Sequence, residues 1–152
     1  VIHVEDGDTL TILQGDNSRV SVRLSDIDAP ETSHGRRRPG QPYSQASRQS
    51  LTALTKGQQV MATCYENDRW VRPVCTVFVS GQDVGSEQLR RGMAWVNRLN
   101  RAYVRNPQSE AIEAQAKTAG LGLWSASGPR PVPPWEWRSG CWVNQVCDGA
   151  VQ

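Results

Sequence analysis

Residues 19–32 read "RVSVRLSDIDAPET" and change character halfway along, from an alternating apolar segment to a crowded group of acids. In the first half, apolar side chains fall at every second position, which predicts a β-strand with one apolar face. These side chains are Val20, Val22 and Leu24. Arg23 projects from the opposite face of the same strand. The stretch therefore predicts a half-buried strand that brings one arginine next to a group of carboxylates.

The second half of this stretch places three acids, Asp26, Asp28 and Glu31, around a proline. Acids this close together repel one another unless water solvates them or a cation lies between them. Another pair of acids occurs in "DGDT" at residues 6–9, where Asp-Gly is a dipeptide favoured in hairpin turns. Two interpretations stay open here: solvated turns, or a cation site that combines Asp8 with Asp28 and Glu31.

Carboxylates gathered at turns suit a hard divalent cation, which takes oxygen ligands and keeps several waters. The chain has only two histidines, and none stands among these acids, so calcium or magnesium is favoured over zinc. Arg23, together with Arg72 at the end of "NDRWVR" (67–72), adds two guanidinium groups. A cation, a carboxylate base and two arginines suit phosphoryl transfer, because they stabilise charge on phosphorus and activate water. The alternative for either arginine alone is a surface ion pair of little energetic value.

The composition is that of a globular domain with an arginine-rich surface. The chain has 152 residues, of which 38% are hydrophobic and 21% charged, and no apolar run is long enough to span a bilayer. Net charge is only +2, but just two of the 17 basic residues are lysine, and arginine suits bidentate phosphate contacts. The arginines concentrate in residues 35–40, 89–101 and 135–138. We expect a polyanionic partner, with a merely solvated basic surface as the alternative.

Four cysteines occur without CxxC spacing, which argues against a zinc site. Cys64 and Cys75 lie in two apolar segments joined by a polar turn, where they can face each other across a hairpin. Cys141 and Cys147 bracket a short loop near the end of the chain. Two disulfides are favoured over reduced cysteines in core positions. We therefore expect an exported protein, periplasmic or secreted, whose signal peptide is not part of this sequence.

Periodicity and turn residues predict five or six short strands and three helices. The strands are expected at residues 1–4, 9–13, 19–24, 58–65, 71–79 and 93–96, and the helices at 43–57, 85–92 and 106–120. This content predicts a closed β-barrel with helices packed on it, an α+β protein. The Pro-rich "GPRPVPPW" (128–135) predicts an extended segment that lies on the body of the protein. We divide the chain into a domain at 1–128 and a Pro/Trp-rich C-terminal extension at 129–152.

Five motifs in order along the chain resemble the staphylococcal nuclease (thermonuclease) family. They are "DGDT" (6–9), "RLSDIDAPE" (23–31), "DRWVR" (68–72), "LRRGMAWV" (89–96), and "EAQAK" followed by "GLW" (113–124). "PPWEWR" (133–138) also resembles the tail of many bacterial relatives. The resemblance covers nearly the whole chain. It implies a five-stranded OB-fold-like β-barrel with about three helices.

The resemblance implies roles for the residues that match. Asp8 and Asp28 match the calcium carboxylates of the family, and Glu31 matches the glutamate that positions or deprotonates the attacking water beside the metal. Arg23 and Arg72 match the two arginines that contact the phosphate and stabilise its transition state. These five positions carry the residue types that the family uses.

Other positions depart from the family pattern. Ala29 stands where threonine usually contributes its backbone carbonyl to the metal, a role that the change leaves possible. Trp70 and Val71 replace tyrosine and glycine before the second arginine, and Trp70 can stack on a base or cap the end of the barrel. Tyr103 is the candidate for the nucleotide-contacting tyrosines. Asp26 matches no functional position, and we expect it to be a solvated neighbour.

The resemblance implies a metal-dependent, sugar-nonspecific nuclease that uses Ca²⁺, with Mg²⁺ as the alternative, and leaves 3′-phosphate ends. Its expected partners are DNA and RNA, preferably single-stranded, with no membrane partner and a monomeric chain. The basic loop at 34–42 is expected to hold the polynucleotide backbone through Arg36, Arg37 and Arg38. The alternatives are a catalytically weak nucleic-acid-binding module on the same barrel, and an arginine-rich, disulfide-stapled interaction protein whose acids only form turns.

Overall fold

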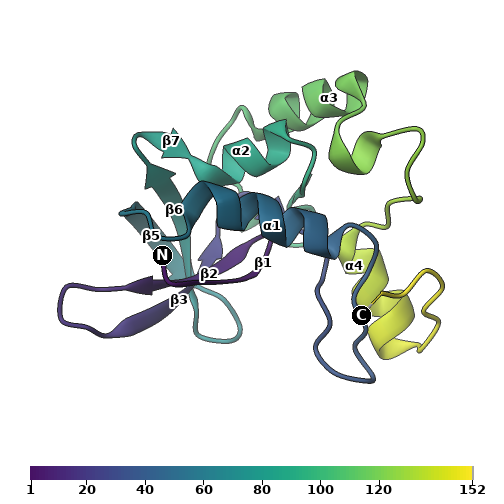
Figure 1. Cartoon of the computed structure of the whole chain (residues 1–152), viewed down its shortest axis with the longest axis horizontal. Helices are drawn as coiled ribbons and strands as arrows, with labels where there is room; N and C mark the ends of the chain where they lie inside the picture. Colours follow the sequence, from purple (N-terminus) through teal and green to yellow (C-terminus); the bar gives the residue numbers. More distant parts are fainter. Residues whose placement is uncertain (152) are drawn as a thin grey trace.

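The structure is a computed structural model that describes residues 1–151, and it combines a sheet with short helices (Figure 1). The strands are β1 (His3–Asp6), β2 (Thr9–Leu13), β3 (Arg19–Leu24), β4 (Ile27–Asp28), β5 (Met61–Asn67), β6 (Pro73–Val79), β7 (Gln82–Asp83) and β8 (Trp95–Val96). The α-helices are α1 (Ser44–Thr55), α2 (Val84–Arg90), α3 (Ser109–Ala119) and α4 (Pro134–Trp137). Shorter helical turns are η1 (Arg101–Tyr103), η2 (Gly122–Trp124) and the π-helical η3 (Arg138–Val143).

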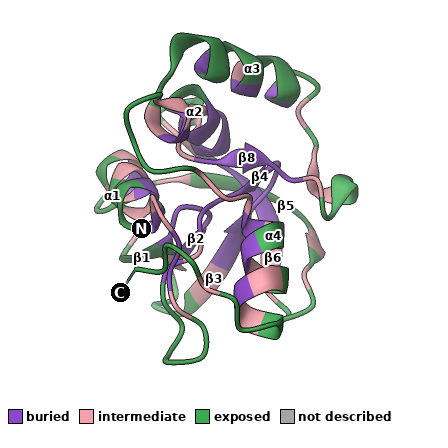
Figure 2. Cartoon of the chain, turned by 90° about the vertical axis from the view of Figure 1, so that its right-hand side faces the viewer, coloured by how far each residue is buried: buried purple, intermediate pink, exposed green. Residues whose placement is uncertain are grey.

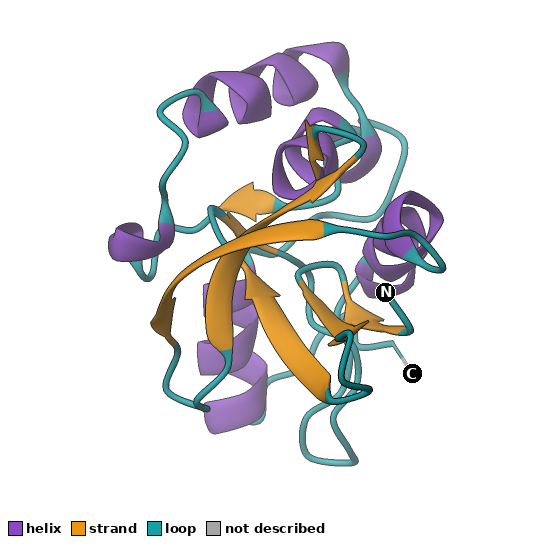
Figure 3. Ribbon diagram, turned by 90° about the vertical axis from the view of Figure 1, so that its left-hand side faces the viewer, coloured by secondary structure: helices purple, strands orange, loops and turns teal. Residues whose placement is uncertain are grey.

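The main sheet has the strand order β1-β2-β3-β6-β5, with β7 added beside β6, and a separate small sheet pairs β4 with β8 (Figure 3). The pairs β1–β2, β2–β3 and β5–β6 are antiparallel, whereas β3 and β6 run parallel. The α+β class is confirmed, and β2 and β3 have the predicted bounds. The two-residue strands β4 and β7 were not predicted, because so short a segment shows no periodicity.

The hydrophobic core lies between the main sheet and helices α1 and α2. Its buried cluster comprises Val4, Leu10, Val22, Leu24, Ile27, Ala29, Leu51, Cys75, Val77, Val84, Leu89, Ala94 and Val96. Figure 2 shows buried residues on the inner side of α3 and exposed residues on its outer side, whereas α2 is mostly buried or half-buried. Gly7 permits α1 to approach the β1–β2 turn, because a Cβ atom there would lie 1.8 Å from Ser47 Oγ. Helix α1 therefore packs directly against the turn that carries the first acids.

Both expected disulfides are present. Cys64 and Cys75 face each other across the predicted β5–β6 hairpin, and Cys141 pairs with Cys147 after α4. All four cysteines are thus oxidised, as is typical of proteins that fold in an oxidising compartment. None of the helices in residues 1–151 combines the length and apolar character that crossing a lipid bilayer requires.

The C-terminal extension lies against the loop that precedes α1, and the two segments are neighbours in Figure 1. A β-bridge joins Gly40 of this loop to Val151, the last residue that the structure describes. The prediction of an extended segment holds only as far as Pro133, because the chain turns helical at Pro134. Proline fits the first helical position, since its fixed φ suits the helix and its missing N–H would lack a partner there. Burial of Trp137 and Cys141 holds the helical turns in place.

Candidate active site

The register of the sheet brings the first acid next to the first arginine. Thr9 of β2 pairs with Arg23 of β3, so the turn that carries Asp8 lies beside the end of β3. The Leu24 N–H donates to the Asp8 carbonyl over 2.8 Å, which fixes this turn on the strand. Arg23 Nη1 then lies 3.0 Å from Asp8 Oδ2. Arg23 projects from the face of β3 opposite the core, and its contacts with carboxylates bury it there.

The short strand β4 positions the second acid. Asp28 pairs with Trp95 of β8 and is only 1% exposed. The Ala29 N–H donates to Asp8 Oδ2 over 2.7 Å, which ties the two acidic segments together. Arg23 Nη2 lies 3.5 Å from Asp28 Oδ1, so one guanidinium group spans both carboxylates. Asp8 and Asp28, which are 20 residues apart in the chain, therefore both lie beside the Arg23 guanidinium group.

Glu31 follows β4 and lies in the same cluster. Its backbone N–H donates to Gln41 Oε1 over 2.9 Å, and its carbonyl accepts the Gln41 N–H over 2.9 Å. Gln41 is fully buried and also donates to the Val132 carbonyl of the C-terminal extension. Gln41 was not among the predicted site residues, because its place in the basic loop gave no sign that it holds the Glu31 backbone.

The acids of the cluster do not all carry the same charge. Burial raises the pKa of Asp6 well above its usual range, and the neighbouring Asp8 carboxylate adds to this rise. For Asp8 the effect of burial is outweighed, because Arg23 and hydrogen bonds including those from Ala29 and Thr9 hold its pKa below the usual value. Burial also raises the pKa of Glu31 to about 7, with a further increase from Asp8 and an opposing effect of Arg138. Asp8 is therefore ionised, whereas Glu31 is poised to gain or lose a proton near neutral pH.

A second guanidinium group, from Arg138 of the C-terminal extension, contacts the same acids. Arg138 Nη1 lies 2.7 Å from Glu31 Oε1, and Arg138 Nη2 lies 2.8 Å from Asp28 Oδ2. Arg138 belongs to the basic "WEWR" segment, but no role was predicted for it from the sequence. The contact to Glu31 spans 107 positions of the chain, and no local pattern reports so distant a pairing.

Arg72 lies immediately before β6, the strand that runs parallel to β3. The register pairs Arg23 with Val74, so Arg72 precedes the partner of Arg23 by two residues in the neighbouring parallel strand. Its side chain is held by Asp68, with Arg72 Nε 2.8 Å from Asp68 Oδ2. The structure orients Arg72 through Asp68, a carboxylate outside the acidic cluster.

Comparison with known proteins identifies the family of the chain that carries this acidic and arginine-rich cluster. Residues 21–126 match the family model described as "Staphylococcal nuclease homologue". The chain belongs to the staphylococcal nuclease family. The matched residues contain every site residue expected from the sequence except Asp8, and the match confirms the fold class expected from the motifs.

Several relatives of this staphylococcal nuclease homologue carry the name of a nuclease. It is 32% identical over 148 residues to an uncharacterized endonuclease of Haemophilus influenzae, covering 97% of this chain and 76% of the relative. It is 35% identical over 150 residues to a micrococcal nuclease of Shigella flexneri, covering 91% of this chain and 78% of the relative. A probable staphylococcal-like nuclease of rice, Oryza sativa subsp. japonica, is 34% identical over 117 residues, which are 77% of this chain and 32% of that longer protein.

The carboxylates of this staphylococcal nuclease homologue fit a hard divalent cation. Asp8, Asp28 and Glu31 converge on guanidinium groups, which shows that the cluster accommodates positive charge. Their oxygens are ligands of the type that Ca²⁺ and Mg²⁺ prefer. Among residues 1–151, Asp6, Glu31 and His34 place ligand atoms within 4.8 Å of one another, so Asp6 belongs to the acidic cluster. The expectation that no histidine stands among the acids is wrong, because the fold of the 34–42 loop sets His34 Nε2 3.6 Å from Glu31 Oε2. The DGD pattern was the available signal for Asp6, but only its second acid was assigned a role.

The aromatic and basic residues predicted to contact substrate occupy different surroundings. Trp70 is 61% exposed, with the Arg69 guanidinium 4.9 Å from its ring centre, which leaves its side chain open to solvent and does not support the alternative role as a cap of the barrel. Arg36, Arg37 and Arg38 are exposed in the 34–42 loop. Arg38 lies 5.7 Å from the ring centre of Trp142, so the C-terminal extension is part of their surroundings. Tyr103 is half-buried, and its carbonyl accepts the Asp26 N–H over 2.8 Å.

The prediction that Asp26 is a solvated neighbour is wrong. Asp26 is buried, and its Oδ2 accepts hydrogen bonds from the backbone N–H groups of Arg105 and Asn106 and from the Ser109 hydroxyl. Ser109 is the first residue of α3, so this carboxylate connects the β3–β4 turn to the beginning of that helix. The acid spacing in "SDID" does not reveal this role, because its hydrogen-bond donors lie about 80 residues later in the chain.

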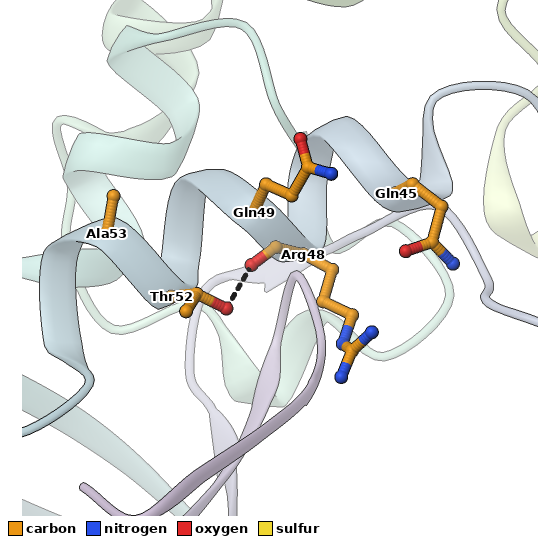
Figure 4. Close-up of a pocket in the computed structure, with 5 residues that line it drawn as sticks. All are labelled: Gln45, Arg48, Gln49, Thr52 and Ala53. Atoms are coloured by element: carbon orange, nitrogen blue, oxygen red, sulfur yellow. Dashed lines mark hydrogen bonds between the residues drawn. The ribbon is translucent and has the colours of Figure 1, made fainter.

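A surface pocket of about 370 Å³ lies along α1 and is lined by Gln45, Arg48, Gln49, Thr52 and Ala53 (Figure 4). Its lining contains no carboxylate. Arg48, its one charged side chain, donates to the Val4 carbonyl over 3.0 Å. We assign this pocket no catalytic role, because the chemically reactive groups are gathered at the acidic cluster.

Proposed function

We propose that this protein is a divalent-cation-dependent, sugar-nonspecific nuclease that cleaves phosphodiester bonds of DNA and RNA and leaves 3′-phosphate ends. The observation that carries the proposal is the buried cluster in which Arg23 spans Asp8 and Asp28 while Glu31 lies beside them. Membership of the staphylococcal nuclease family supports a nucleic-acid substrate in general terms. The metal, the substrate preference and the product ends are inferences of our own.

Asp8, Asp28, Glu31 and the Ala29 carbonyl would hold Ca²⁺, or alternatively Mg²⁺. When bound, the cation would withdraw electrons from a phosphate oxygen and favour deprotonation of a nearby water. Arg23 and Arg72 would bind the phosphate oxygens, because their planar forks match two oxygens at once. These two cationic groups stabilise the negative charge that grows on the phosphate as it becomes pentacoordinate.

Glu31 would serve as the general base. Its pKa of about 7 allows it to accept a proton from water near neutral pH, and its backbone is held by Gln41. Glu31 accepts a proton as the water oxygen attacks phosphorus, the P–O5′ bond breaks, and the 5′ oxygen leaves and takes a proton from solvent. The phosphate stays on the 3′ oxygen of the upstream fragment.

We propose that exposed side chains near the cluster guide single-stranded DNA or RNA. Exposed Trp70 offers a face on which a base can stack, a contact worth about 1–3 kcal/mol that requires no particular sequence. The arginines at 36–38 would attract the phosphate backbone. Phosphorus within a single strand reaches such a site more easily than phosphorus within a stiff duplex. We also propose that the protein acts as a monomer in the periplasm or outside the cell, where its two disulfides would be stable.

The decisive measurement is a cleavage assay on single- and double-stranded DNA and on RNA, in Ca²⁺, in Mg²⁺ and in EDTA, with end-group analysis. We expect EDTA-sensitive cleavage, faster on single strands, with 3′-phosphate products. Glu31→Gln and Arg72→Ala should each reduce kcat by at least about a hundredfold, because each removes a group that acts in the transition state. Glu110→Gln, an exposed acid on α3, serves as the control that keeps its activity.

Two results would contradict this proposal. Clean binding of nucleic acid without cleavage in either metal would favour a binding module on the same barrel. Full activity in both site variants would favour an interaction protein whose acids only form turns and a contaminating nuclease as the source of cleavage.

A further inference from the structure

The Arg138 guanidinium uses both carboxylate oxygens of Asp28. Arg138 Nη1 lies 3.2 Å from Asp28 Oδ1, and Nη2 lies 2.8 Å from Asp28 Oδ2. The same Nη1 lies 2.7 Å from Glu31 Oε1. A forked pair of this kind is among the strongest hydrogen-bonded ion pairs, since it combines charge with two aligned donors. Arg138 is therefore a member of the acidic cluster and not a surface cation near it.

The C-terminal extension is built to hold Arg138 in this place. Trp137 and Trp142, on either side of Arg138 in the chain, both donate their indole N–H to the Pro39 carbonyl, over 3.0 Å and 2.9 Å. The disulfide between Cys141, within the π-helical turn, and Cys147 closes the loop that follows Arg138 by three residues. The arginine thus begins a short helical turn that is anchored to the loop next to Glu31.

Asp28 is surrounded by positive charge in this arrangement. Arg138 contacts both of its oxygens, and Arg23 approaches Oδ1 from the other side at 3.5 Å. A divalent cation that binds an Asp28 oxygen competes with these guanidinium groups, because like charges at contact distance repel one another. Arg23 also pairs with Asp8, whereas the contacts of Arg138 in the cluster are limited to the two acids Asp28 and Glu31.

We propose that Arg138 is an internal counter-cation of the metal site, which the divalent cation displaces from Asp28 when it binds. This inference rests on the proposed function, in which Asp28 and Glu31 hold the cation. Arg138 stabilises the metal-free protein by neutralising acids that would otherwise repel one another. The same contact weakens metal binding, because the ligand and the guanidinium compete for the same oxygens. The C-terminal extension therefore sets the concentration of divalent cation that is needed to fill the site.

The test is a direct Ca²⁺ titration by calorimetry, without nucleic acid and at one pH and ionic strength. It compares the wild type with Arg138→Gln and with Arg138→Lys. The control is Arg130→Gln, which removes the same charge from an exposed position of the same extension. We expect Arg138→Gln to bind Ca²⁺ at least about tenfold more tightly, since a competing unit charge at contact distance is removed. Arg138→Lys should fall in between, because lysine keeps the charge but cannot hold both oxygens. Arg130→Gln should match the wild type.

Thermal unfolding in EDTA provides the second readout. Arg138→Gln should have a lower Tm than the wild type without metal, and Ca²⁺ should raise its Tm by more than it raises that of the wild type. If Arg138→Gln does not fold without metal, Arg138→Lys decides the question: tighter Ca²⁺ binding supports the proposal and unchanged binding overturns it.

Unchanged or weaker Ca²⁺ binding by a folded Arg138→Gln protein overturns the inference, as does an equal gain in Arg130→Gln. These failures differ from failure of the proposed function. A wild type that cleaves with Ca²⁺ while Arg138→Gln binds Ca²⁺ no more tightly refutes only the role of Arg138. A wild type that neither binds Ca²⁺ nor cleaves nucleic acid refutes the proposed function itself.

Discussion

Val71 has φ of 60° and is 76% exposed, in the tight turn between Asp68 and Arg72. Positive φ is strained for a β-branched residue, because its two γ carbons crowd the backbone. Nothing buried compensates for this strain, since the side chain faces solvent. Val71 stands where the family has glycine, and it therefore strains the backbone next to Arg72. The strained turn is the segment that orients this arginine.

We predict that Val71→Gly stabilises the protein by up to about 1 kcal/mol, because relief of strain exceeds the entropy that glycine adds to the unfolded chain. Denaturant unfolding of the purified variant measures the change. Val143→Gly is the matched control: Val143 is also 76% exposed but belongs to a helical turn, where replacing valine by glycine costs about 0.5 kcal/mol. Equal destabilisation by both substitutions would show that the turn at Val71 is not strained.

At the scale of elements, the acidic turn between β3 and β4 joins the sheet to α3. The Asp26 carboxylate accepts hydrogen bonds from the N–H groups of Arg105 and Asn106 just before this helix, and from the Ser109 hydroxyl at its beginning. The Asp26 carbonyl also accepts the Asn97 N–H over 2.8 Å, next to β8. One buried carboxylate thus organises the approach to α3, while its neighbour Asp28 contributes to the site.

We predict that Asp26→Ala lowers the free energy of unfolding by about 2–4 kcal/mol, since it leaves several donors without a partner in a buried region. Chemical denaturation monitored by far-UV circular dichroism measures the loss. Asp148→Ala, at an exposed position near the end of the chain, should change stability by less than about 0.5 kcal/mol. A similar small effect of Asp26→Ala would show that the helix begins correctly without this acid.

For the whole molecule, the core and the C-terminal extension are stabilised by separate contacts. Every buried residue of the hydrophobic core cluster precedes residue 129. The extension instead contacts the loop before α1, through Trp137, Trp142 and Val151. The proposed division at residues 128 and 129 predicts that the extension shapes the site without being required for the fold.

We predict that a chain ending at residue 128 folds cooperatively but loses about 3–5 kcal/mol, the value of burying a tryptophan such as Trp137. Amide hydrogen exchange should accelerate at Gly40, whose N–H donates to the Val151 carbonyl, and stay slow at Leu24, whose N–H donates to the Asp8 carbonyl within the sheet. Thermal unfolding and exchange measured together test this. Loss of cooperative unfolding would mean that the extension belongs to the folding unit.

The local elements and part of the site followed from sequence. Alternation of apolar residues located β3 and put Arg23 on its other face, and cysteine positions in a hairpin predicted the disulfide between Cys64 and Cys75. The acids were identified as a group because Asp28 and Glu31 lie close together in the chain and a second acidic turn precedes them. Such signals are short-range, and periodicity or turn chemistry expresses them directly.

Only the tertiary structure decided which acids carry which charge and what faces them. The pairing of β2 with β3 brought Asp8 to Arg23, and the fold of the extension brought Arg138 to Asp28 and Glu31. Burial then separated the pKa values of acids that look equivalent in sequence, and it gave Asp26 a structural role. The reason is physical: charge and pKa depend on distance and burial in three dimensions, and contacts across about a hundred residues leave no pattern in the chain.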